Sequence, residues 1–144
     1  MAYHRMTADE VYGFLKASPA RPGVLATAGA DGRTHVAPIW YAVDDDDIVF
    51  NTGTDTVKGR HLGRAGRASL CVHDDRPPYA FASLEGPVTL SEEPAELRRW
   101  ATVIGGRYMG AERAEEFGAR NGVPGELLVR LRPERIVGAG DLAD

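Results

Sequence analysis

The sequence has a single cysteine, Cys71, and its apolar runs are short. A lone cysteine cannot form an intrachain disulfide, and a free thiol suits a reducing compartment, so we expect a cytoplasmic protein. Cys71 itself is expected in the core, as a small hydrophobic residue rather than a nucleophile. Glycine, proline or charge breaks every apolar run well before the roughly 20 residues of a bilayer span, and the opening stretch MAYHRMTADE lacks the apolar segment of a secretory signal. No membrane partner is therefore expected.

The chain also lacks a surplus of positive charge, because 17 Lys and Arg residues against 21 Asp and Glu residues give a formal net charge of −4 at pH 7. General nucleic-acid binding needs a surplus of cations, so no nucleic-acid partner is expected. The four histidines and the one cysteine show no metal-ligand spacing, and no metal site is predicted. A length of 144 residues fits one domain spanning residues 1–144.

What the chain does contain is a helix followed by a series of short strands with helices between them. Thr7 and Glu10 form a capping box for a helix over residues 8–17. Alternating patterns and turn residues predict strands at 23–29, 34–43, 47–53, 68–73, 79–90 and 125–140, and further helices near 56–64, from 94 onward and at 111–120. Antiparallel strands at short spacing with inserted helices favour a mainly β, α+β fold built as a small barrel. The strand at 34–43 is apolar on both faces and is expected to be covered on both sides, whereas Asp44–Asp47 is expected to be a solvated turn.

The segment from Phe50 to Val72 carries the chemistry. A strand ends at a Thr-Gly turn and leads into a helix, capped by Thr54 or Asp55, whose first turn holds Thr56 and Lys58. A helix N-terminus with a hydroxyl and an ammonium group beside it forms a phosphate cradle. The alternative is a surface helix with a solvated Lys58, and the charge of Asp55 would repel a phosphate unless its side chain points away.

Three pieces of sequence together carry a family resemblance: the strand His35–Trp40, then Phe50-Asn51-Thr52 and Thr56-Val57-Lys58, followed by the strand pair 69–73 and 79–90. In this order they resemble the pyridoxamine 5′-phosphate oxidase-like split barrel, an FMN-binding fold that also contains deazaflavin-dependent reductases. The resemblance covers about residues 8 to 138. It implies a six-stranded antiparallel split β-barrel with flanking helices, and a homodimer in which the partner completes the site.

The resemblance also implies which residues hold the cofactor. The implied cofactor-binding residues are Val36, Ala37, Pro38, Ile39 and Trp40 along the ring system, Asn51 and Thr52 on the phosphate or sugar chain, Thr56, Val57 and Lys58 at the phosphate, and Pro78 and Tyr79 from the partner. Arg60, with Arg64 and Arg67, either meets an acidic cofactor tail or lies on a solvated helix face.

Two departures from the family pattern shift the expected cofactor. The chain ends in RIVGAGDLAD without the basic C-terminal signature that binds a vitamin B6 phosphate, and Val36 and Tyr41 stand where a basic residue would meet the phosphate of FMN. The resemblance therefore points to the coenzyme F420 branch.

The expected function is an F420-dependent oxidoreductase that transfers a hydride between a deazaflavin and a small organic acceptor. The alternatives are an FMN-dependent oxidoreductase of the same fold and a non-catalytic flavin- or deazaflavin-binding protein. No catalytic side chain is assigned, and the proton donor is His73, Tyr79 or solvent.

Overall fold

The computed structural model describes residues 3–143. Its elements, in chain order, are β1 (His4–Arg5), α1 (Ala8–Lys16), β2 (Gly23–Ala28), β3 (Thr34–Ile39), β4 (Ala42–Asp44), β5 (Asp47–Gly53), α2 (Val57–Ala65), β6 (Arg67–Asp74), β7 (Ala80–Ser91), α3 (Pro94–Met109), the short 3-10 helix η1 (Ala111–Arg113), α4 (Ala114–Asn121), β8 (Glu126–Leu131) and β9 (Arg135–Gly140).

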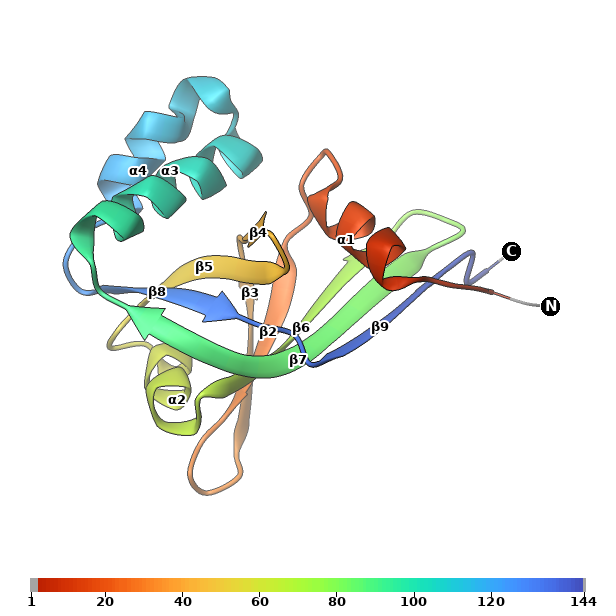
Figure 1. Ribbon diagram of the computed structural model, residues 1–144, viewed down its shortest axis with the longest axis horizontal. Helices are drawn as coiled ribbons and strands as arrows, with labels where there is room; N and C mark the ends of the chain where they lie inside the picture. Colours follow the sequence, from red (N-terminus) through yellow and green to blue (C-terminus); the bar gives the residue numbers. More distant parts are fainter. Residues whose placement is uncertain (1–2, 144) are drawn as a thin grey trace.

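The strands form a mainly antiparallel sheet that curls into a half-barrel with four flanking α-helices, as Figure 1 shows. The order across the sheet is β3-β2-β6-β7-β8-β5-β4, and β9 joins at β7 with β1 beyond it. The long strand β7 links the two halves, because its residues 81–85 pair with β9 whereas its residues 88–91 pair with β8. The predicted split-barrel fold is therefore confirmed.

Two hydrophobic clusters fill the fold. The larger one lies inside the barrel and includes the fully buried Tyr41 and Phe50, together with Leu15 of α1. The smaller one lies under α3, where Leu97, Trp100 and Ile104 recur at helical spacing and pack on β5 and β8. The capping box predicted at Thr7 and Glu10 is present at the start of α1.

The expected count of six strands is wrong, because the described residues form nine: two long strands are each broken, and the two-residue strand β1 was not expected. Residues 34–43 divide into β3 and β4 at Trp40 and Tyr41, where the Tyr41 backbone N–H donates to the Tyr108 hydroxyl at 3.3 Å instead of to a strand. Residues 125–140 divide into β8 and β9 around Pro133, which has no N–H to donate. The expectation that 34–43 is covered on both sides is also wrong within this chain, since Val36 is 66% exposed.

Cys71 lies on the surface of the chain and not in the core. Successive side chains of a strand point to opposite faces, and on β6 the neighbours Leu70 and Val72 are the ones that fill the core. Neighbouring atoms still shield part of the thiol from water, which raises the pKa of Cys71 and does not favour a reactive thiolate.

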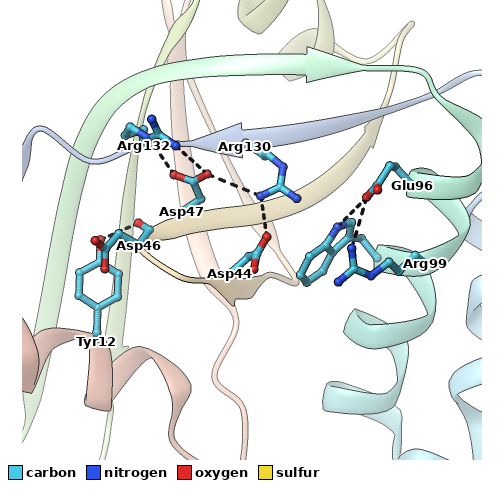
Figure 2. Close-up of polar contacts among 9 residues, drawn as sticks. Tyr12, Asp44, Asp46, Asp47, Glu96, Arg99, Arg130 and Arg132 are labelled. Atoms are coloured by element: carbon cyan, nitrogen blue, oxygen red, sulfur yellow. Dashed lines mark hydrogen bonds and ion pairs between the residues drawn. The ribbon is translucent and has the colours of Figure 1, made fainter.

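The two ends of the Asp44–Asp47 turn are tied to the barrel, as Figure 2 shows, whereas the two residues between them are exposed, as expected for a solvated turn. Asp47 is buried and accepts from Arg132 at 3.1 Å, and Arg130 bridges Asp47 and Asp44. The backbone carbonyl of Asp46 also accepts from the Tyr12 hydroxyl of α1 at 2.7 Å. These contacts anchor the β4–β5 hairpin to β8 and to α1.

Candidate functional site

A cavity of about 410 Å³ opens between β3, β5 and α3, next to the first turn of α2. One side of it is apolar and the other carries polar groups. The apolar lining consists of Pro22, Pro38, Ile39, Trp40, Ala101 and Ile104, and the polar lining consists of Asn51, Thr52, Gly53, Lys58, Asn121 and Glu126. The cavity thus brings together six of the predicted cofactor residues: Pro38, Ile39, Trp40, Asn51, Thr52 and Lys58.

The first turn of α2 packs directly against the end of β5. Thr56 is the N-cap residue, so the expected cap at Thr54 or Asp55 is wrong. The Thr56 hydroxyl accepts from the Gly59 N–H at 3.0 Å and donates to the Gly53 carbonyl at 2.8 Å. Both hydrogen bonds hold α2 in place, and they engage the hydroxyl that the sequence assigns to a phosphate.

Lys58 lines the cavity from the first turn of α2 and is partly buried. The partial positive charge of a helix N-terminus and a lysine ammonium group at the same place both favour an anion. The Asp55 backbone carbonyl accepts from Arg60 at 2.6 Å, and Arg60 and Val57 are exposed outside the cavity lining. The cation of this cavity is therefore Lys58.

Glu126, which the sequence analysis did not single out, faces the same cavity from the start of β8. Its Oε1 accepts from Asn51 Nδ2 at 3.1 Å, and the same amide donates to the Asn121 carbonyl at 3.1 Å. Burial raises the pKa of the Glu126 carboxyl above its ordinary value, against the opposing effects of the Asn51 hydrogen bond and the Lys58 charge.

Trp40, which lines the cavity, belongs to an aromatic stack. The Trp40 ring lies flat on the Tyr108 ring, with centroids 5.1 Å apart and an interplanar angle of 4°, and meets the edge of Phe117. The Tyr108 hydroxyl donates to the Arg21 carbonyl at 2.8 Å, and burial raises the pKa of Tyr108 to about 12. The stack holds the Trp40 indole in one orientation beside the cavity.

Arg107 fixes this stack from behind. Its guanidinium lies 4.6 Å from the centre of the Tyr41 ring and 5.5 Å from that of Tyr108. It also donates to the backbone carbonyls of Tyr41, at 2.7 Å, and of Leu15. Arg107 therefore joins the end of α1, the break between β3 and β4, and α3.

The remaining predicted residues lie elsewhere. Val36 points to the outer face of β3, and Ala37 is half-buried opposite Leu25. Pro78 and Tyr79 line a second cavity of about 370 Å³ with Arg76 and Asp141. The structure thus places these four outside the cavity that holds Lys58.

Tyr79 is held in an unusual backbone conformation. Its φ of 66° is left-handed, which bulky residues rarely adopt, and its ring is 42% exposed. Beside it, hydrogen bonds from Arg76 lower the pKa of Asp74 to about 2, and Arg21 pairs with the same carboxylate at 3.2 Å. This ion-paired turn presents Tyr79 outward.

Two further groups have structural partners. Arg67 forms ion pairs with Glu85 at 2.9 Å and Glu134 at 2.7 Å. One of the three arginines that were expected either to meet a cofactor tail or to be solvated is therefore already paired within the chain. His61 Nδ1 lies 3.0 Å from the buried Thr27 hydroxyl, under α2. His73 is exposed and lines a third cavity, beside Arg21.

Over residues 3–143, no helix has the length and apolar character to cross a membrane. Within the same range, His, Cys, Asp and Glu side chains form no cluster of three or more that could hold a metal ion.

A sequence profile described as pyridoxamine 5′-phosphate oxidase matches residues 8–138. The chain belongs to this family. A curated relative is the 5a,11a-dehydrotetracycline/5a,11a-dehydrooxytetracycline reductase of Streptomyces rimosus, which is 31% identical over 117 residues, or 80% of this chain and 71% of the relative. The pyridoxamine 5′-phosphate oxidase family and the split barrel support flavin-type oxidoreductase chemistry.

Solved structures share the fold of this chain. A conserved hypothetical protein from Mycobacterium tuberculosis superposes with a TM-score of 0.80 at 30% identity, covering 94% of this chain and 86% of that one. A protein named F420 reductase superposes with a TM-score of 0.67 at 23% identity, covering 85% of this chain and 93% of that one, and shares the fold.

Proposed function

We propose that this protein is an F420-dependent oxidoreductase that transfers a hydride between a deazaflavin and a small organic acceptor. The observation that carries the proposal is the cavity lined by both Trp40 and Lys58, which combines an aromatic side chain with a cation at a helix N-terminus. A cofactor with a planar ring and a phosphate needs these two features together. The named reductases among the relatives support the same chemistry.

Each side of the cavity has a separate task in this proposal. Lys58 and the free N–H groups at the start of α2 bind the phosphate, and Asn51 and Thr52 contact the chain that joins it to the ring. Pro38, Ile39 and Trp40 bind the ring and exclude water from it. The bound cofactor supplies the hydride, while the protein supplies position and a dry site.

FMN in the same cavity is the second candidate. The ion pairs of Arg67 with Glu85 and Glu134 favour it, because they weaken the basic groove that the acidic tail of F420 would use. FMN has no such tail and needs only the Lys58 end of the cavity. A protein that binds either cofactor without turnover is the remaining alternative.

We also propose a cytoplasmic homodimer formed through the outer face of the sheet. Val24 pairs with Pro38 on one side and with Cys71 on the other, and Val36 and Val137 lie exposed on the flanking strands β3 and β9. This exposed apolar face crosses the sheet, and such faces mark interaction sites. Since Pro38 also lines the cavity, a partner on this face would lie beside the cofactor.

The test compares Lys58→Ala with Lys16→Ala, which removes the other lysine, an exposed residue at the end of α1. Fluorescence titrations with F420 and with FMN measure both affinities. We expect Lys58→Ala to weaken cofactor binding about 10- to 100-fold, the worth of a hydrogen bond to a charged group, and Lys16→Ala to leave it unchanged.

The outcomes separate the candidates. Stronger binding of F420 than of FMN supports the deazaflavin proposal and calls for an acceptor screen, whereas the reverse keeps the fold and changes the cofactor. Tight binding without turnover across that screen supports the storage alternative. Equal cofactor affinity of Lys58→Ala and the wild type would contradict the proposal that Lys58 binds the phosphate.

A further inference from the structure

Glu126 is an unusual neighbour for a phosphate-binding lysine. It stands opposite Gly53 in the β5–β8 pair, and the two side chains Glu126 and Lys58 line one cavity. Asn51 holds its Oε1, and its Oε2 lies over Gly53, where an added Cβ would come within 3.3 Å of it. The carboxyl group is thus a fixed part of the cavity rather than a solvated surface group.

The charges around Glu126 leave the Lys58 end of the cavity without a positive surplus. Lys58 faces Glu126 from α2, whereas Asn51 of β5 and Asn121 of α4 are neutral amides. Glu92, which precedes α3, is exposed and lines only a separate small cavity of about 160 Å³, to which Glu126 also contributes. An anion that binds Lys58 is therefore also close to a carboxylate.

This arrangement distinguishes phosphates by their charge. A terminal phosphate monoester carries about −1.5 to −2 at pH 7, because its second pKa is about 6. A bridging phosphate diester has no second ionisation and carries one negative charge. One additional charge about 4 Å from a carboxylate costs on the order of fivefold in affinity even at the dielectric constant of bulk water, and more at a protein surface.

We propose that Glu126 is a specificity-determining residue that disfavours phosphate monoesters and admits singly charged phosphate diesters at Lys58. The inference rests on the proposed function and deepens it, because FMN ends in a phosphate monoester whereas the phosphate of F420 is a bridging diester. Glu126 then selects F420 over FMN through charge, independently of the ring and of the cofactor tail.

The test measures the dissociation constants of F420 and FMN for the wild type, Glu126→Gln and the control Glu92→Gln. A glutamine at 126 keeps an acceptor for Asn51 and removes the charge. We expect Glu126→Gln to strengthen FMN binding by about fivefold or more relative to any change in F420 binding. The preference of the protein for F420 over FMN is then smaller. Glu92→Gln, whose side chain lines only the neighbouring cavity, is expected to leave the preference unchanged. An unchanged ratio of the two constants in Glu126→Gln would overturn the inference while leaving the cofactor assignment intact.

A second arm uses phosphates without a flavin ring. Phenyl phosphate is a monoester and methyl phenyl phosphate a diester, and amide chemical shifts of Gly53 and Lys58 report their binding. Preferential binding of the diester by the wild type, lost in Glu126→Gln, supports the inference even if neither cofactor binds and the proposed function fails. Preferential binding of the monoester by the wild type, or binding of neither probe, would overturn it.

Discussion

At the scale of single residues, burial and a neighbouring cation act in opposite directions on the Glu126 carboxyl. Burial is the larger effect, so its pKa in the folded chain lies above the ordinary value. Below the ordinary pKa the carboxyl group is protonated in both the folded and the unfolded chain. As the pH rises the unfolded chain loses the proton first, so the folded state is destabilised as the pH passes through the raised pKa.

A stability measurement on Glu126→Gln tests whether the Glu126 carboxyl destabilises the folded state as the pH rises. Glutamine does not titrate, so we expect the variant and the wild type to melt alike near about pH 4 and the variant to be more stable near about pH 8. The gain is expected to stay below about 1 kcal/mol, because solvent screens a partly exposed group. Thermal melts across this pH range provide the measurement, with the exposed Glu92→Gln as control. A stability difference that is the same at both ends of the range would contradict the raised pKa.

Sequence separation explains which site residues were predictable. Lys58 and Trp40 belong to short local patterns, a helix start and an aromatic strand end, and the structure places both at the cavity. Glu126 is 75 positions from Asn51, and Tyr108 is 67 positions from Tyr41. The pairing of β5 with β8 brings the first two residues together at the cavity, and the packing of α3 brings the second two together behind it. No local sequence pattern predicts either contact.

At the scale of elements, the position of α2 depends on how closely its first turn approaches β5. Gly59 is buried, and a Cβ added there would overlap the Gly53 carbonyl oxygen. Gly63, one turn later, is exposed and has no neighbouring atoms within 4 Å of an added Cβ. The same substitution should therefore have opposite effects at these two positions.

We expect Gly59→Ala to destabilise the protein by about 1–3 kcal/mol, because the overlap forces α2 away from β5. Gly63→Ala should stabilise it by up to about 1 kcal/mol, since alanine favours an exposed helix position. Urea unfolding measures both, and cofactor titration shows whether the displaced α2 also weakens binding at Lys58. Equal effects of the two substitutions would mean that α2 does not depend on this approach.

Element types were predictable from periodicity and capping, whereas the strand breaks were not. The break at Trp40 and Tyr41 depends on Tyr108 and Arg107, which satisfy the backbone groups that a continuous strand would have paired. Likewise, the alternation that predicts β6 does not reveal which of its faces is the core, so Cys71 was assigned to the wrong side. Both errors come from tertiary contacts that override a local pattern.

At the scale of the whole molecule, one face of the curled sheet lacks the cover that helices give the other parts of the barrel. Val36 is 66% exposed and Val137 is 46% exposed on this face. Val103 of α3 is similarly exposed, at 45%, and lies outside this face. A homodimer would cover the first two valines and leave the third in solvent.

We expect Val36→Asp to shift the protein from dimer to monomer, because each protomer would bring a charge into the apolar face. Val103→Asp should leave the dimer intact. Sedimentation velocity over a range of concentrations measures the shift, and cofactor titration of the same variants shows whether the partner completes the site. A wild type that sediments as a monomer at all concentrations would reject the dimer.

The two tryptophans differ in a way that makes one of them an optical probe. Trp40 is 36% exposed in the cavity wall, whereas Trp100 is 5% exposed beneath Arg99 and Arg130. A Trp100→Phe variant would leave Trp40 as the single tryptophan of the chain, and a ligand in the cavity whose absorption overlaps the tryptophan emission would quench it. The cavity therefore carries its own fluorescent reporter of cofactor binding.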